Sequence, residues 1–182
     1  MKKKLLLHIC CGPCSTAVLE RLTDEFDITL HWFNPNISPQ AEHDKRFEQI
    51  HLLPGELKII VDENYMVKAH DWFNYTKEHA DAQEGGARCE KCFDFRLREC
   101  ARVAKANSFD IFTTTLSVSP QKNAETINRI GEEISLEFEI EYLQANFKKA
   151  NGYLRSIELS KEYGLYRQNY CGCIYSLPHT HD

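Results

Sequence analysis

Short apolar runs alternate with amphipathic stretches along most of the chain. The apolar runs predict strands over residues 4–9, 28–33, 57–61, 110–115 and 138–143. Between and after them, apolar residues recur at helical spacing, which predicts helices over residues 15–26, 40–53, 65–75, 89–105, 123–134 and 152–162. Repeated strand–helix units are typical of an α/β fold, so we expect a mostly parallel sheet with helices on both faces.

The length and the pattern predict one folding unit. A chain of 182 residues can bury a sizeable core, and no repeat or linker marks a boundary, so we expect a single domain over residues 1–182. Residues 65–106 contain no predicted strand. They are expected to form a helical insertion beside the sheet that carries a Cys-x-x-Cys pair, Cys89 and Cys92.

The composition of the chain indicates the class of protein and the compartment in which we expect it. Hydrophobic residues make up 42% of the chain and charged residues 27%, as in ordinary soluble proteins. No apolar run approaches the roughly 20 residues that span a bilayer. The apolar run near the start is too short for a signal peptide, so we expect a cytoplasmic protein. The net charge of −5 argues against generic nucleic-acid binding but leaves room for a local basic surface.

Cysteines supply the strongest chemical signal. In a cytoplasmic protein, eight cysteines are expected to be thiols or metal ligands rather than structural disulfides. Seven of them fall into three close groups: Cys10, Cys11 and Cys14; Cys89 and Cys92; Cys171 and Cys173. Cys100 lies on the apolar side of a predicted helix and is expected to belong to the core.

The predicted fold gives the first cysteine group a place. In open parallel sheets, ligands bind beyond the carboxyl ends of the strands. Loops that carry Cys10, Asn34 and Thr115 follow the first, second and fourth predicted strands. We therefore expect these loops to lie at one edge of the sheet.

Spacing alone leaves several kinds of site open. The Cys-Gly-Pro-Cys sequence that ends at Cys14 resembles a thioredoxin redox motif, but the adjacent Cys10 and the position after the very first strand argue against it. Four thiolates from the first two groups suit structural zinc or an iron–sulfur cluster, and the neighbouring Cys10 and Cys11 favour a cluster. Cys171 and Cys173 are too close for an unstrained disulfide, so they are expected to be redox-active or to bind a metal.

Five segments in a fixed order carry a resemblance to a known family: LLLHICCGPCS, FNPNISPQAEHDKR, RCEKCFDFRL, TTLSVSPQK and YRQNYCGCIYS. Together they resemble the QueH-type epoxyqueuosine reductases over nearly the whole chain. The resemblance implies that the protein reduces the epoxide of epoxyqueuosine at the tRNA wobble position to the alkene. The implied partners are the tRNAs for aspartate, asparagine, histidine and tyrosine, together with an unidentified electron donor.

The resemblance also implies roles for individual cysteines. Cys10, Cys11, Cys89 and Cys92 match the ligands of a [4Fe-4S] cluster. An additional mononuclear iron is implied near the cluster, and Cys14 is a possible ligand for it. In the same way, Cys171 and Cys173 match the pair described as a redox-active disulfide and are the expected catalytic residues.

The fold resembles the Rossmann-like HUP group that includes the PP-loop ATP pyrophosphatases. Those proteins carry a Ser-Gly-Gly-x-Asp-Ser phosphate cradle where this chain has Cys-Cys-Gly-Pro-Cys-Ser, so we expect no ATP binding. The expected substrate contacts are polar and aromatic residues: Asn34, Asn36, Arg46, Thr115, Arg167 and Tyr170. Two other hypotheses remain, a zinc-stapled tRNA-binding module and a thioredoxin-like thiol-disulfide oxidoreductase.

Overall fold

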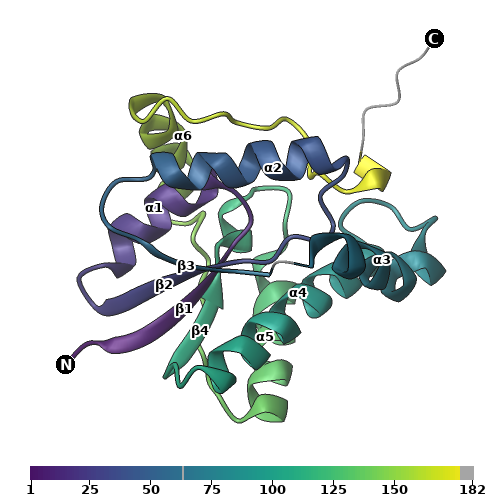
Figure 1. Cartoon of the computed structure of the whole chain (residues 1–182), viewed down its shortest axis with the longest axis horizontal. Helices are drawn as coiled ribbons and strands as arrows, with labels where there is room; N and C mark the ends of the chain where they lie inside the picture. Colours follow the sequence, from purple (N-terminus) through teal and green to yellow (C-terminus); the bar gives the residue numbers. More distant parts are fainter. Residues whose placement is uncertain (63, 177–182) are drawn as a thin grey trace.

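A parallel five-stranded sheet forms the centre of the computed structural model, which describes residues 1–62 and 64–176 (Figure 1). The strand order is β3-β2-β1-β4-β5, and every neighbouring pair is parallel. The strands are β1 (Lys3–Ile9), β2 (Phe26–Trp32), β3 (Lys58–Val61), β4 (Ile111–Thr114) and β5 (Glu141–Tyr142). The predicted α/β fold with a parallel sheet is confirmed.

In the part of the chain that the structure describes, six α-helices connect and flank these strands. They are α1 (Gly12–Leu22), α2 (Gln40–Glu48), α3 (Tyr65–Thr76), α4 (Ala87–Ala106), α5 (Ala124–Phe138) and α6 (Gly152–Glu162). The segment expected as a helical insertion holds α3, a short 3₁₀ turn and α4, and none of its residues is assigned to a strand. No helix in the described part of the chain is long and apolar enough to cross a membrane.

The central strand β1 explains how the sheet separates two cores. Leu5, Leu6 and Leu7 are all fully buried, because successive side chains of a strand point to opposite faces and both faces are covered here. Leu5 and Leu7 pack with residues of α1 on one face, whereas Leu6 packs with residues of α4 and α5 on the other. Figure 1 shows α1, α2 and α6 on one side of the sheet and α4 and α5 on the other.

Several predicted boundaries were wrong for local reasons. The helix predicted over residues 15–26 begins at Gly12 because Pro13 suits a first helical turn and Cys11 caps it, while Phe26 already belongs to β2. The strand predicted over residues 138–143 shrinks to Glu141–Tyr142 because α5 continues to Phe138. The helix ends there because Glu139 adopts a left-handed conformation, with φ of 51°.

The strand order places a topological switch point, where successive strands change from one side of the sheet to the other, at β1. The chain passes from β1 to β2 on one side and reaches β4 on the other side only after α4. The loops that follow β1 and β4 therefore diverge at the carboxyl edge of the sheet, which is where ligands bind in such folds. Cys10 lies at the end of β1 and Thr115 at the end of β4, so the site begins here.

Candidate functional site

Three thiols cluster directly after β1. The sulfur atoms of Cys10, Cys11 and Cys14 all lie within 4.8 Å of one another. Cys10 and Cys11 are buried and Cys14 is half-buried. Among the residues that the structure describes, this is the one group of three or more histidine, cysteine or acidic side chains spaced to hold a metal ion. Soft thiolates in this arrangement suit zinc, copper or an iron–sulfur cluster.

Hydrogen bonds hold two of the three thiols in place. The hydroxyl oxygen of Thr115 accepts a hydrogen bond from the Cys10 backbone N–H at 3.2 Å and lies 3.5 Å from the Cys10 sulfur, to which it donates. The backbone N–H of Cys14 donates to the Cys11 sulfur at 3.4 Å. The end of β4 and the first turn of α1 thereby orient two of the three sulfur atoms.

Two cations favour negative charge on this group. Hydrogen bonds from Cys11 and Cys14 lower the pKa of the Cys10 thiol well below its ordinary value, and the charges of Lys122 and Arg96 lower it further. The hydrogen bond shared with Cys10 raises the pKa of Cys11 to about 12, and those shared with Cys10 and Cys11 raise the pKa of Cys14. The protein thus stabilises a thiolate at Cys10, which is the form that ligates metals.

The thiols border a large cavity of about 510 Å³. Its lining includes Cys10, Cys14 and Cys171. A second, smaller cavity is lined by Cys89, Cys92, Cys171 and Cys173. Cys171, Arg96 and Lys122 line both cavities, so all three cysteine groups surround one two-chambered site.

The second group opens α4 at the small chamber. The backbone N–H of Gly85 donates to the Cys89 sulfur at 3.2 Å. The buried Nε1 of Trp72 and Nε of Arg96 have no hydrogen-bond partner among the described residues. Burial raises the pKa of Cys92, although Arg96 and Trp72 both act to lower it. Unpartnered buried N–H groups near this thiol fit a thiolate ligand, because metal ligation requires the deprotonated sulfur.

The third group lies on the segment that follows α6. A hydrogen bond from Cys173 lowers the pKa of the Cys171 thiol well below its ordinary value, and Lys122 and Arg96 add to this effect. The pKa of Cys173 is raised by the same hydrogen bond and by burial. Both thiols are free in this structure. Cys171 is therefore the more nucleophilic of the two.

Lys122 and Arg96 are the charged partners that the cysteine motifs alone did not reveal. Burial disfavours the charge of Lys122, but Cys171, Cys10 and Cys14 together outweigh that cost and raise its pKa. Arg96 is 2% exposed and its guanidinium donates to the side-chain oxygen of Asn34. Because Arg96 follows Cys92 by four residues on a helix, this helical spacing is the signal in the sequence that could have placed it beside the thiols.

The expected substrate contacts divide into two sets. Asn36, Arg46, Arg167 and Tyr170 line the large cavity. Asn34 and Thr115 are absent from its lining, since Asn34 donates to the Ile9 carbonyl oxygen and Thr115 binds Cys10. Those two residues shape the loops of the site.

Together these features define a class: an α/β protein with a thiol-rich site, suited to metal binding, at the carboxyl edge of a parallel sheet. Comparison with known proteins identifies the family. Residues 5–179 match the family model described as "Epoxyqueuosine reductase QueH". This chain belongs to the QueH family.

Named relatives agree with this assignment. The epoxyqueuosine reductase QueH of Streptococcus pyogenes serotype M1 is 37% identical, over 97% of this chain and 71% of that protein. The Staphylococcus aureus protein of the same name is also 37% identical, over 97% of this chain and 76% of its own length. The Thermotoga maritima protein is 35% identical, over 95% of this chain and 90% of its own length.

Proposed function

We propose that the protein is an epoxyqueuosine reductase that acts in the cytoplasm on the wobble nucleotide of tRNAs for aspartate, asparagine, histidine and tyrosine. The observation that carries the proposal is the pairing of QueH family membership with three cysteine groups around one two-chambered cavity. The reaction takes two electrons and two protons, converts the epoxide to an alkene and releases the oxygen as water. An electron donor, still unidentified, completes the set of partners.

Cys10, Cys11, Cys89 and Cys92 would hold a [4Fe-4S] cluster, and Cys14 would help to hold an additional iron. The donor set supports this proposal, because backbone N–H groups donate to the sulfurs of Cys11 and Cys89, and Arg96 and Trp72 act to lower the pKa of Cys92. Cys14 already groups with Cys10 and Cys11, which favours its taking part in metal binding. When bound, an iron–sulfur cluster supplies electrons one at a time.

The chain's own residues would prepare the site for this reaction. Hydrogen bonds from neighbouring thiols, and then the positive charges of Lys122 and Arg96, lower the pKa of Cys10 and Cys171 and so favour the thiolate form of both. Cys171 and Cys173 are the proposed catalytic pair. The cavity of about 510 Å³ lies within the range of ligand pockets and has room for one nucleoside turned out of the anticodon stack.

Substrate contacts would come from the mouth and wall of this cavity. Tyr170 is half-buried there and offers an aromatic ring on which a base can stack. Asn36 is 2% exposed and its side-chain oxygen has no hydrogen-bond partner within residues 1–62 and 64–176, so it is a suitable acceptor for a base N–H. Arg167 donates to the Ser156 carbonyl oxygen and retains other N–H groups for an RNA phosphate.

Metal analysis and an activity assay test the proposal together. Protein purified without oxygen should contain about four sulfides and four to five irons per chain. It should convert epoxyqueuosine to queuosine in tRNA, as measured by mass spectrometry of the digested nucleosides. Cys89→Ser should lose sulfide and activity, whereas Cys100→Ala, a matched control in the core, should keep both.

Two outcomes would overturn the proposal. Stoichiometric zinc without sulfide, persisting after anaerobic reconstitution with iron and sulfide, would favour a zinc-stapled tRNA-binding module. Disulfide reductase activity that requires Cys11 and Cys14 but survives Cys89→Ser would favour a thioredoxin-like oxidoreductase.

A further inference from the structure

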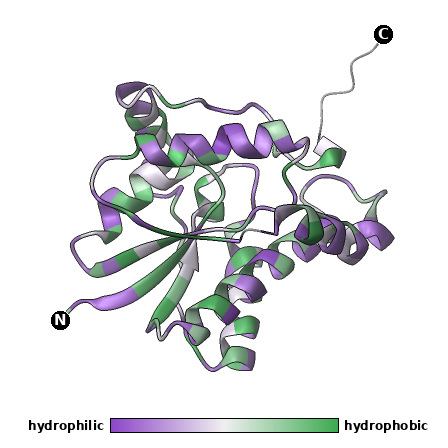
Figure 2. Ribbon diagram, in the orientation of Figure 1, coloured by the Kyte–Doolittle hydropathy of each residue, from purple (hydrophilic) through white to green (hydrophobic). Residues whose placement is uncertain are grey.

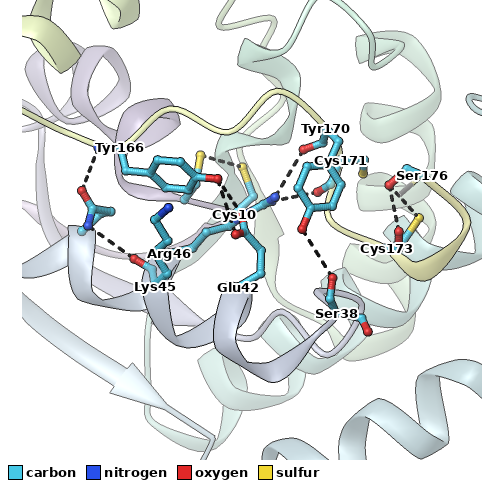
Figure 3. A network of polar contacts seen from close by, with 12 residues as sticks. Cys10, Ser38, Glu42, Lys45, Arg46, Tyr166, Tyr170, Cys171, Cys173 and Ser176 are labelled. Atoms are coloured by element: carbon cyan, nitrogen blue, oxygen red, sulfur yellow. Dashed lines mark hydrogen bonds and ion pairs between the residues drawn. The ribbon is translucent and has the colours of Figure 1, made fainter. Parts of the chain in front are cut away.

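The segment that carries Cys171 and Cys173 runs along α2 (Figures 1 and 3). It has no regular secondary structure between the end of α6 and a 3₁₀ turn at Ile174–Ser176. Figure 2 shows that α2 is a largely hydrophilic ribbon. Polar contacts therefore hold much of the segment on the helix.

These contacts occupy three successive backbone carbonyls. The Nη2 of Arg46 donates to the Tyr170 carbonyl oxygen at 3.3 Å, and its Nη1 donates to the Cys171 carbonyl oxygen at 2.9 Å. The backbone N–H of Ser38, just before α2, donates to the Gly172 carbonyl oxygen at 2.8 Å. All three carbonyls before Cys173 are thereby bound from α2 and the turn that leads into it.

Arg46 is built to face inward. Its side chain is 2% exposed, and its Nε donates to Oε1 of Glu42 at 2.7 Å. The ring of Tyr170 lies over the guanidinium at 5.0 Å. The Nε of Arg46 donates to Glu42, and both terminal nitrogens donate to carbonyl oxygens, so the guanidinium binds the protein's own backbone (Figure 3).

The backbone conformation and the close surroundings of Gly172 both favour a residue without a side chain. Its φ is +107°, a conformation that side chains rarely adopt. A Cβ added there would lie 2.6 Å from Nη1 of Arg46. The glycine therefore allows both the turn of the segment and the close approach of the guanidinium.

We propose that Arg46 is a positioning residue for the Cys171–Cys173 pair: by binding the carbonyl oxygens of Tyr170 and Cys171, it keeps both thiols facing the two chambers. The inference rests on the proposed function, which assigns the reduction to this pair. It gives Arg46 a role different from the phosphate contact expected of a basic residue in an RNA-binding enzyme.

Alkylation of Cys173 measures whether the segment is held. Cys173 is 7% exposed, so iodoacetamide reaches it slowly while the segment stays on α2. In the anaerobic holoprotein, Arg46→Ala should raise the alkylation rate of Cys173, followed by peptide mass spectrometry, by at least about tenfold, because two charge-assisted hydrogen bonds are lost. Cys100 is fully buried in the core, and its unchanged rate would show that the fold is intact.

Two variants make the test specific. Lys45→Gln removes a charge from the same helix. The Lys45 ammonium lies over the Tyr166 ring and binds none of the three carbonyls. The alkylation rate of Cys173 should therefore stay at the wild-type value in this variant. Arg46→Lys keeps the charge and the buried stem, but an ammonium lacks the fork that binds Glu42 and two carbonyls together. Arg46→Lys should also raise the alkylation rate of Cys173. If Arg46→Ala unfolds, this variant tests the inference in its place.

A parallel measurement of tRNA affinity separates positioning from RNA binding. Arg46→Lys should raise the Cys173 alkylation rate whether or not tRNA affinity changes, because Tyr170 and Arg167, two of the proposed RNA contacts, lie on the same segment. An unchanged alkylation rate of Cys173 in a folded Arg46 variant would overturn the inference. Weaker tRNA binding without a faster alkylation of Cys173 would make Arg46 a phosphate contact. Because alkylation needs no epoxyqueuosine, its result stands apart from success or failure of the reductase assay.

Discussion

His31 gives the protein a pH-dependent stability that can be worked out from its surroundings. The side chain is on β2, is 1% exposed, and stacks on Phe33 with ring centroids 5.9 Å apart. Its Nδ1 is buried and has no hydrogen-bond partner in the described structure. Burial lowers the pKa of His31 to about 4, although Glu99 and Asp62 oppose that change.

The sign of the effect follows from the two states. In the unfolded chain the imidazole takes up a proton near its ordinary pKa of about 6.5, whereas in the folded chain it stays neutral until the pH approaches 4. Between these values the unfolded state binds more protons, so stability falls as the pH falls. From pH 7 to pH 5 the loss attributable to His31 is about 2 kcal/mol.

A comparison of variants isolates this contribution. His31→Phe keeps a ring against Phe33 but cannot titrate, and His70→Phe alters an exposed histidine on α3. Urea unfolding at pH 7 and pH 5, followed by tryptophan fluorescence under reducing anaerobic conditions, gives the change in unfolding free energy. Between pH 7 and pH 5, the unfolding free energy of wild type and of His70→Phe should each fall by about 2 kcal/mol more than that of His31→Phe. Equal losses in wild type and His31→Phe would refute the reasoning.

Two further predictions concern a buried hydrogen bond at the site and the close packing of α5 against β5. Thr115→Val should lower the unfolding free energy by about 1–3 kcal/mol, because the buried N–H of Cys10 loses its acceptor; a thermal melt with an unchanged midpoint would contradict this. Gly131→Ala should cost a similar amount, about 1–3 kcal/mol, because the new Cβ would lie 2.3 Å from the Tyr142 ring. Full retention of the melting midpoint in that variant would mean that the ring can move aside at no cost.

The hydrophobic pattern was sufficient to predict the sheet, since buried strands such as β1 are continuous apolar runs and their order of alternation with helices requires parallel pairing. It was insufficient for the short strand β5, because Phe138 fits either the end of an apolar strand or the last turn of α5. The left-handed Glu139 that ends the helix has no signature in the sequence.

The cysteine motifs predicted the parts of the site and the meeting of its first two groups, but not the contacts that bring the third group to them. Spacing identified the three cysteine groups, and the fold placed the first at the carboxyl edge of the sheet. That Cys171 reaches the same cavity depends on contacts between α2 and residues more than 100 positions later, such as the bond from Arg46 to the Cys171 carbonyl. Local sequence patterns carry no information about such distant pairs.

The order of the chain sets a condition on how the site is assembled in the cell. Cys10, Cys11 and Cys14 are made about 160 residues before Cys171, which shares their cavity. At the usual rate of protein synthesis, the delay between them is roughly 10 to 30 s. For much of that interval the first thiols lack the strand β4, and for all of it they lack the segment that will enclose them. Their protection from oxidation while synthesis continues must therefore come from the surroundings and not from the fold.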